Sequence, residues 1–162
     1  MSESAHHITE HTVVGWREWV RLPDVGVEWI KAKVDTGAKT SSLHAFDLHS
    51  FRRDDRDWVR FGIHPWQATA TDQVEVELPV HDSRFVRSSS GHNEERYVVL
   101  LPLVLGGRVV DAEVTLAGRD EMGFRMLIGR EALVQGYTVD PARSYLGGRP
   151  PRALRRRNWG RG

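Results

Sequence analysis

The residues that could most readily take part in a chemical reaction form the stretch Val34-Asp35-Thr36-Gly37-Ala38. A carboxylate at the end of a strand can be packed on one side and open to a ligand on the other. The threonine hydroxyl can hydrogen-bond to nearby backbone or to a second copy of itself. The glycine permits close backbone approach, and the alanine leaves room for a substrate chain. Because turns are rich in these residue types, the triplet taken alone also fits a structural turn.

Two flanking elements would have to position this stretch. Apolar residues at 30, 32 and 34 alternate with Lys31 and Lys33, which is the period of two expected of a half-buried strand. Far downstream, the sequence MLIGREAL at 126–133 predicts an apolar strand that ends at Gly129. A helix of about two turns is predicted to follow over residues 130–135.

The rest of the chain predicts an all-β fold. Residues 13–22, 41–51, 59–63 and 74–80 have strand patterns. Gly106-Gly107 lies between two apolar runs and predicts a β-hairpin, and a last short strand is predicted at 137–139. The segment from Ser88 to His92 predicts a flexible tip. Many short strands with turn signals and one late helix are typical of a barrel.

Length and composition indicate one soluble globular domain. The chain has 162 residues and no cysteine, which excludes disulfides, thiolate catalysis and Cys-based zinc sites. The first residues are polar and lack the apolar core of a signal peptide. The longest apolar run, 97–105, contains Pro102 and is too short to cross a bilayer. We therefore expect a cytoplasmic protein without a membrane segment.

Charge divides the chain unevenly. Six of the 23 Lys and Arg residues fall in residues 149–162, which have no acidic residue; this leaves 17 basic against 22 acidic residues elsewhere. We expect a flexible N-terminal tail at 1–12, a domain at 13–148 and an Arg-rich C-terminal tail at 149–162. Such a tail can bind nucleic acid or another polyanion, or serve as a disordered solubilising terminus.

The Asp-Thr-Gly-Ala stretch and the later Gly129-Arg130 together resemble the retropepsin-like aspartic peptidases, over about residues 29–133. The resemblance implies a closed β-barrel with one short C-terminal helix, assembled as a two-fold homodimer. It also implies site roles, with Asp35 catalytic and the flap over the substrate near His92. The implied supports of the active-site loop are Thr36, Gly37, Ala38 and Gly129, and the arginine after that glycine braces the dimer in the family. We expect Ser90, Gly91, His92 and Arg130 to bind substrate.

Peptide hydrolysis of this kind needs two carboxylates that share a proton, one acting as base on a water and the other as acid. The chain has one Asp-Thr-Gly, and Asp82-Ser83-Arg84 lacks the glycine. A working pair therefore requires Asp35 from two copies of the chain, so the chemistry predicts a homodimer.

A closer likeness is to the bacterial RimB-like family within this group, which is also described as ATP-dependent zinc proteases. It implies partnership with ATP-grasp ligases that add glutamates to a protein C-terminus, and a peptidase that trims those glutamate tails. The matching stretches are VGWRE at 14–18, KVDTGAKTS at 33–41, the segment 87–96 with its Ser-Gly-His core, MGFRML at 122–127 and VDPARSY at 139–145.

The chain departs from the viral members just after the catalytic stretch. Where those enzymes commonly carry acidic residues that pair with the arginine of the second motif, this chain has Lys39 and Thr40. Arg130 must therefore have another partner. A positive charge beside the catalytic acid also favours an anionic substrate, so we expect Lys39 and Thr40 to bind substrate.

Two alternatives stay open. The barrel could be a non-catalytic peptide-binding module that has lost turnover. Less favoured is a zinc peptidase, because the only inverted zinc motif, His7-Ile8-Thr9-Glu10-His11, lies in the terminal tail without an apolar helical face. The sequence has no phosphate-binding loop. We expect neither a metal nor a cofactor.

Overall fold

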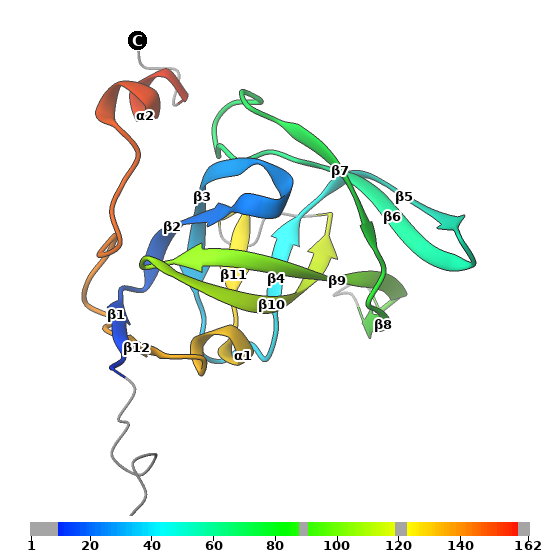
Figure 1. Ribbon diagram of the computed structural model, residues 1–162, viewed down its shortest axis with the longest axis horizontal. Helices are drawn as coiled ribbons and strands as arrows, with labels where there is room; N and C mark the ends of the chain where they lie inside the picture. The colour runs from blue at the N-terminus through cyan, green and yellow to red at the C-terminus, as the bar shows by residue number, and fades with distance from the viewer. Residues whose placement is uncertain (1–9, 88–90, 119–122, 159–162) are drawn as a thin grey trace, which may run out of the picture.

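The computed structural model describes residues 10–87, 91–118 and 123–158, most of which lie in strands (Figure 1). This agrees with the mostly-β fold expected from the sequence. The elements are β1 (Thr12–Val14), β2 (Arg17–Leu22), a short 3-10 helix (Pro23–Val25), β3 (Val27–Val34), β4 (Ser41–His44), β5 (Phe46–Arg53), β6 (Arg56–Ile63), β7 (Val74–Pro79), β8 (Asp82–Arg87), β9 (Asn93–Leu105), β10 (Arg108–Ala117), β11 (Met126–Ile128), α1 (Arg130–Leu133), β12 (Tyr137–Val139) and α2 (Arg152–Asn158).

Seven strands form the main sheet in the order β10-β4-β11-β3-β2-β9-β8. The strands β9 and β10 lie far apart in this order but also pair with each other in antiparallel fashion, so the sheet curls round until they meet. The strand β8 stays at the edge. On the other side the contact between β2 and β9 is narrow, with the single pair Arg21 and Val104. The strands β5, β6 and β7 form a separate three-stranded sheet, and β1 pairs with β12 in parallel.

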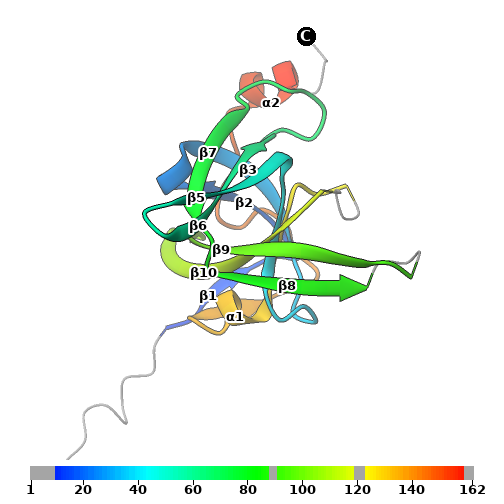
Figure 2. The same cartoon turned by 90° about the vertical axis from the view of Figure 1, so that its right-hand side faces the viewer.

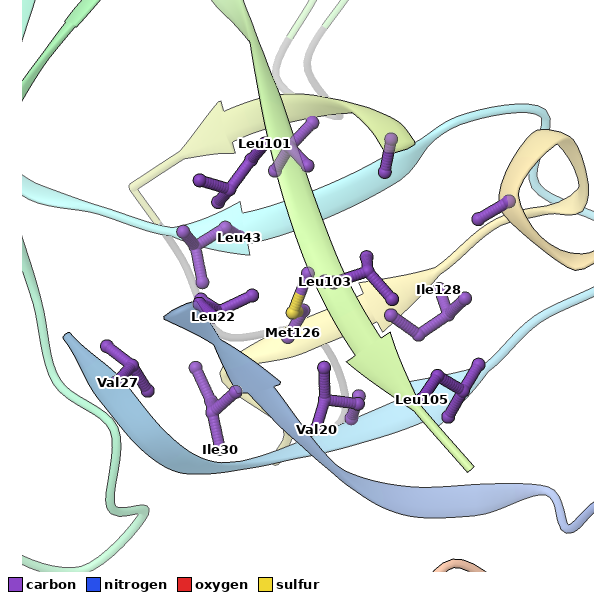
Figure 3. Packing of buried hydrophobic residues seen from close by; sticks show 14 of the residues in the cluster. Val20, Leu22, Val27, Ile30, Leu43, Leu101, Leu103, Leu105, Met126 and Ile128 are labelled. Carbon is purple, nitrogen blue, oxygen red and sulfur yellow. The ribbon is translucent and has the colours of Figure 1, made fainter. Parts of the chain in front are cut away.

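The core lies inside the curled main sheet. Alternate residues of β3 and β9 are buried, because successive side chains of a strand point to opposite faces. Figure 3 shows apolar side chains from β2, β3, β4, β9 and β11 meeting in this interior, and every one of those labelled there is at most 2% exposed. They are Val20, Leu22, Val27, Ile30, Leu43, Leu101, Leu103, Leu105, Met126 and Ile128.

The hairpin predicted at Gly106-Gly107 is confirmed. Leu105 pairs with Arg108 at the ends of β9 and β10. Both glycines have positive φ values, 61° and 80°. A two-residue turn of this kind needs residues that tolerate the left-handed region, which explains the glycine pair.

The prediction of a single strand at 13–22 is wrong, because Gly15 and Trp16 interrupt it and separate β1 from β2. A Cβ on Gly15 would overlap the backbone carbonyl of Arg143, and Trp16 N donates to that same carbonyl at 2.9 Å. The chain therefore leaves the strand to pair with the segment after β12. This contact is remote in sequence, so the local pattern does not contain it.

Glu18 is a fully buried carboxylate that ties the C-terminal segment to β2. Its Oε2 accepts hydrogen bonds from Gly15 N at 2.7 Å and Leu146 N at 3.0 Å, and its Oε1 accepts one from Gly147 N at 3.0 Å. Three backbone donors on one carboxylate compensate for its removal from water. Glu18 therefore acts as a clamp between two distant parts of the chain.

Replacing Glu18 with Gln is expected to lower the free energy of unfolding by about 2–3 kcal/mol, because an amide NH₂ would face a backbone donor. Urea unfolding followed by tryptophan fluorescence measures the change. The matched control, Glu75→Gln, removes the same charge from an exposed position on β7 and should change stability by less than about 0.5 kcal/mol. Equal losses in both variants would contradict the clamp.

The helices differ from the expectation in length and number. The helix predicted at 130–135 is present as α1 but ends at Leu133, before Gly136, whose φ is 139°. The prediction of one helix is wrong, because residues 152–158 of the segment expected to be a tail form α2. Asn158 is buried, so packing as well as propensity holds this second helix. No helix in the described ranges is long and apolar enough to span a membrane.

Candidate active site

The Asp35 loop is held by a strand that comes from far along the chain. β11 lies between β3 and β4, parallel to β3 and antiparallel to β4. Ile128 is paired with Val34, and the next amide, Asp35 N, donates to Ile128 O at 2.9 Å. The loop therefore leaves β3 at a position fixed from the side by β11.

Asp35 is half-buried at the start of this loop. Its Oδ1 accepts a hydrogen bond from Gly37 N at 2.9 Å, and its carbonyl accepts one from Ala38 N at 3.3 Å. Thr36 and Gly37 are exposed beside it. The carboxylate is thus oriented by the backbone of its own loop, and one side of the loop stays open in a single chain.

Gly129 and α1 fix the far side of the loop. Gly129 is buried, and a Cβ at this position would overlap the carbonyl group of Thr40. The first amides of α1 bond to the loop, with Arg130 N donating to Ala38 O at 2.7 Å and Glu131 N donating to Lys39 O at 3.0 Å. Helix N-termini have amides without intrahelical partners, and here two loop carbonyls accept from them.

Ser41 also belongs to this framework, although the sequence analysis gave it no role. The residue is 2% exposed, and its Oγ accepts a hydrogen bond from Gly129 N at 3.1 Å. The hydroxyl satisfies an amide that is buried at the junction of β4 and β11. A serine at the first position of β4 gives no local signal of this contact.

Arg130 has a partner in its own chain. Its Nη1 donates to Thr36 O at 3.1 Å, so the guanidinium contacts the Asp35 loop. Because no acidic residue directly follows Ala38, we expect Arg130 to have another partner, and the Thr36 carbonyl is such a partner. The role of Arg130 in substrate binding stays a prediction.

Lys39 and Thr40 immediately precede β4, and Thr40 is half-buried. Lys39 Nζ is 3.9 Å from Glu131 Oε1, and the two side chains are 73% and 43% exposed. An exposed pair at this distance is weak and screened by salt. The lysine charge is therefore only partly offset and still faces solvent.

Two of the proposed flap residues, Gly91 and His92, lie on a different part of the fold from the Asp35 loop. Gly91, with a φ of 85°, and His92 are exposed between β8 and β9, and Ser90 lies outside the described residues. Figure 2 shows the β8–β9 hairpin projecting from the body of the molecule, whereas α1, to which the Asp35 loop is bonded, lies in that body. Their substrate role stays a prediction.

A cluster of aromatic rings and cations covers the outer side of β2 and β3. The Arg17 guanidinium carbon lies 4.6 Å from the ring centroid of Trp16 and 4.8 Å from that of Tyr145. Burial, with a contribution from Arg17, lowers the pKa of Lys31. Burial raises the pKa of the Tyr145 hydroxyl. The cluster packs Tyr145 of the C-terminal segment against β2, which pairs with the strand that leads to Asp35.

A metal site has no support from the residues that the structure describes, among which no three His, Asp or Glu side chains group closely enough to hold an ion. His11 precedes β1, and its Nδ1 lies 3.1 Å from Thr138 Oγ1. His7 lies outside the described residues, so the inverted motif as a whole is not tested.

An aspartate directly after β3, in a loop anchored by β11 and by a buried glycine before α1, is the arrangement that the resemblance to aspartic peptidases implies. Residues 13–150 match the model of the RimB-like family, described as retropepsin-like aspartic endopeptidase RimB. The chain belongs to this family, which confirms the resemblance found in the sequence.

Curated relatives carry a different name. The chain is 46% identical over 130 residues to a probable alpha-L-glutamate ligase of Desulfotalea psychrophila, a match that covers 80% of this chain and 28% of that protein. It is 47% identical over 138 residues to a protein of the same name from Parasynechococcus marenigrum, covering 85% of this chain and 30% of the relative. The chain thus spans less than a third of the curated relatives it matches.

A solved structure supports the fold over most of the chain. A Legionella pneumophila protein of unknown function superposes with a TM-score of 0.69 and 28% sequence identity. The match covers 84% of this chain and 98% of that one. The Legionella protein therefore has the same fold over almost its whole length.

Proposed function

We propose that the protein is an aspartic endopeptidase that acts as a two-fold homodimer and trims glutamate-rich protein tails. The observation that carries the proposal is the Asp35 loop, with its carboxylate oriented by Gly37 N and its backbone fixed by Ile128 O. One chain contributes one such carboxylate. The half-open loop leaves room for the same loop of a second copy on a symmetry axis.

The proposed reaction is hydrolysis by water held between two Asp35 carboxylates. Two carboxylates at about 3 Å share a single proton. The ionised one takes a proton from the water, which attacks the peptide carbonyl carbon, while the protonated one donates to the carbonyl oxygen. The C–N bond then breaks, and the proton taken from the water passes to the leaving amine.

Charge near the loop supports an acidic substrate. The Lys39 side chain is 73% exposed beside the proposed catalytic loop, and the Arg130 guanidinium donates to the loop carbonyl of Thr36. Positive charge at a cleft raises the local concentration of anionic groups and speeds their association. A run of glutamates suits this field better than an apolar peptide does.

The relatives supply a second, independent reason to choose glutamate. Proteins named probable alpha-L-glutamate ligase contain a segment like this chain within a polypeptide more than three times as long as the match. We infer that the segment works alongside ligation of glutamate and removes what a ligase of the ATP-grasp class adds. The peptidase and the ligase would then act on one protein terminus in opposite directions.

The test is mass spectrometry of peptides incubated with the purified protein. One peptide ends in several glutamates, and a control peptide has glutamines at the same positions. We expect products from the glutamate peptide only. Lys39→Gln should raise the KM for that peptide about fivefold, equivalent to about 1 kcal/mol for an exposed charge, and Lys39→Arg should restore it.

Other outcomes would indicate a different function or a different substrate class. Tight binding of the glutamate peptide with no product over hours would indicate a binding module. Activity that chelators stop, and that pepstatin-like mimics leave unchanged, would indicate a metallopeptidase. Equal cleavage of the glutamate and glutamine peptides would contradict the proposed substrate class while leaving the peptidase assignment intact.

A further inference from the structure

Helix α2 concentrates positive charge in a chain whose remaining part is acidic. The segment 149–162 contains six arginines, no lysine and no acidic residue. Four of the arginines fall within the seven residues of α2. Because the rest of the chain has more acidic than basic residues, α2 forms a positive end on a mildly negative body.

The helix is docked on the barrel through one side. Leu154 lines a hollow of about 450 Å³ together with Trp29 and Trp66. Asn158 is buried, its Nδ2 donates to Leu154 O at 2.8 Å, and its Oδ1 accepts from Thr69 Oγ1 at 3.1 Å. Leu154 and Asn158 are one helical turn apart, so they define the inward face of α2.

The arginines occupy the other sides of the helix. At 3.6 residues per turn, Arg152 and Arg156 lie opposite the inward face, while Arg155 and Arg157 flank it. Arg152, Arg156 and Arg157 are exposed, and Arg155 Nε donates to Pro150 O at 3.1 Å. Within the part of the chain that the structure describes, no carboxylate forms an ion pair with any of these four guanidinium groups.

This surface lies away from the proposed catalytic loop. Figure 1 shows α2 and α1 at opposite ends of the molecule, and the Asp35 loop is bonded to α1. A peptide held at Asp35 therefore does not neutralise the arginines of α2. The positive end is available for a second, separate ligand.

We propose that the exposed arginine face of α2 binds nucleic acid through its phosphodiester backbone, without reading sequence. Guanidinium groups form paired hydrogen bonds with phosphate oxygens and stay charged at all physiological pH values. A nucleic acid presents phosphates at short, regular intervals, so several arginines can bind along one face and release condensed counterions. This inference does not depend on the peptidase activity.

The experiment measures binding of the full chain to a labelled oligoribonucleotide of about 20 nucleotides, longer than most single-stranded sites, by fluorescence anisotropy across a salt series. The test variant is Arg152→Gln with Arg156→Gln, which leaves Leu154 and Asn158 in place. We expect its affinity to fall at least tenfold. The slope of log K against log salt should become shallower by about 1.4, since each lost phosphate contact contributes about 0.7 on a single strand.

A matched control distinguishes the effect of removing arginines from α2 from the effect of lowering the net positive charge of the protein. Arg21→Gln with Arg60→Gln removes two exposed arginines from β2 and β6, and should leave the affinity within about twofold. Thermal unfolding checks that both double variants keep the fold. A DNA oligonucleotide of the same length should bind within tenfold of the RNA, because only phosphate is contacted.

Four results would overturn the inference. They are no binding even at low salt, an equal loss of affinity in the control variant, a preference of more than tenfold for RNA or DNA, and displacement of the oligonucleotide by poly-L-glutamate at equal charge concentration. The last result would assign the helix to acidic polypeptides instead.

Discussion

Asp35→Asn is expected to reduce hydrolysis of a glutamate-tailed peptide by at least about 10³-fold. The amide cannot act as the base toward water, and proton transfer by a positioned side chain contributes about 10²–10⁴-fold to rate. The fold should be retained, because the asparagine Oδ1 can still accept the hydrogen bond from Gly37 N. Initial rates by mass spectrometry and an unfolding curve measure the two effects.

The chain contains a close structural control for this variant. Asp140 is also a partly exposed aspartate whose Oδ1 accepts from an amide two residues later, Ala142 N, at 3.0 Å. Asp140→Asn makes the same chemical change in a similar turn and should leave the rate within about twofold. Full activity of Asp35→Asn would eliminate the proposed mechanism.

Gly129→Ala is expected to destabilise the protein by about 3 kcal/mol or more and to lower activity by at least about 100-fold. The backbone at Gly129, with φ of −93° and ψ of 176°, is open to any residue, so the cost is steric. The added methyl group would overlap the Thr40 carbonyl and lie 3.0 Å from Ala38 O. Separating β11 from the loop would displace Asp35, and small displacements cost large factors in rate.

Gly118→Ala provides the control, because a Cβ at Gly118 meets nothing within 4 Å. It should change the free energy of unfolding by less than about 0.5 kcal/mol. Urea unfolding of both variants gives the comparison. If Gly129→Ala unfolded at the same urea concentration as the parent chain, the packing account of this junction would be wrong.

The parts of the site that could be predicted from the sequence depend on local patterns. The strand before Asp35 follows from alternation, the hairpin from Gly106-Gly107, and the start of α1 from the glycine after an apolar run. The Asp-Thr-Gly-Ala stretch was informative because it could be combined with Gly129-Arg130. Such signals are carried by neighbouring residues and survive without a structure.

The parts that could not be predicted depend on contacts between remote residues. Ser41 and Gly129 are 88 positions apart, and Glu18 and Leu146 are 128 apart. The docking of α2 rests on Thr69 and Asn158, which are 89 positions apart. A buried glutamate or a serine at a strand start gives no periodic signal, so neither residue type indicates which distant amide it will accept from.

The insertion of β11 between β3 and β4 also sets an order of events during synthesis. Asp35 emerges from the ribosome long before Ile128, whose carbonyl accepts from the Asp35 amide. Loops that close over so many residues carry a large entropic cost and form late in folding. A nascent chain therefore cannot anchor the Asp35 loop to β11 until Ile128 has been made, so the loop reaches its final position well after the residues that form it have left the ribosome.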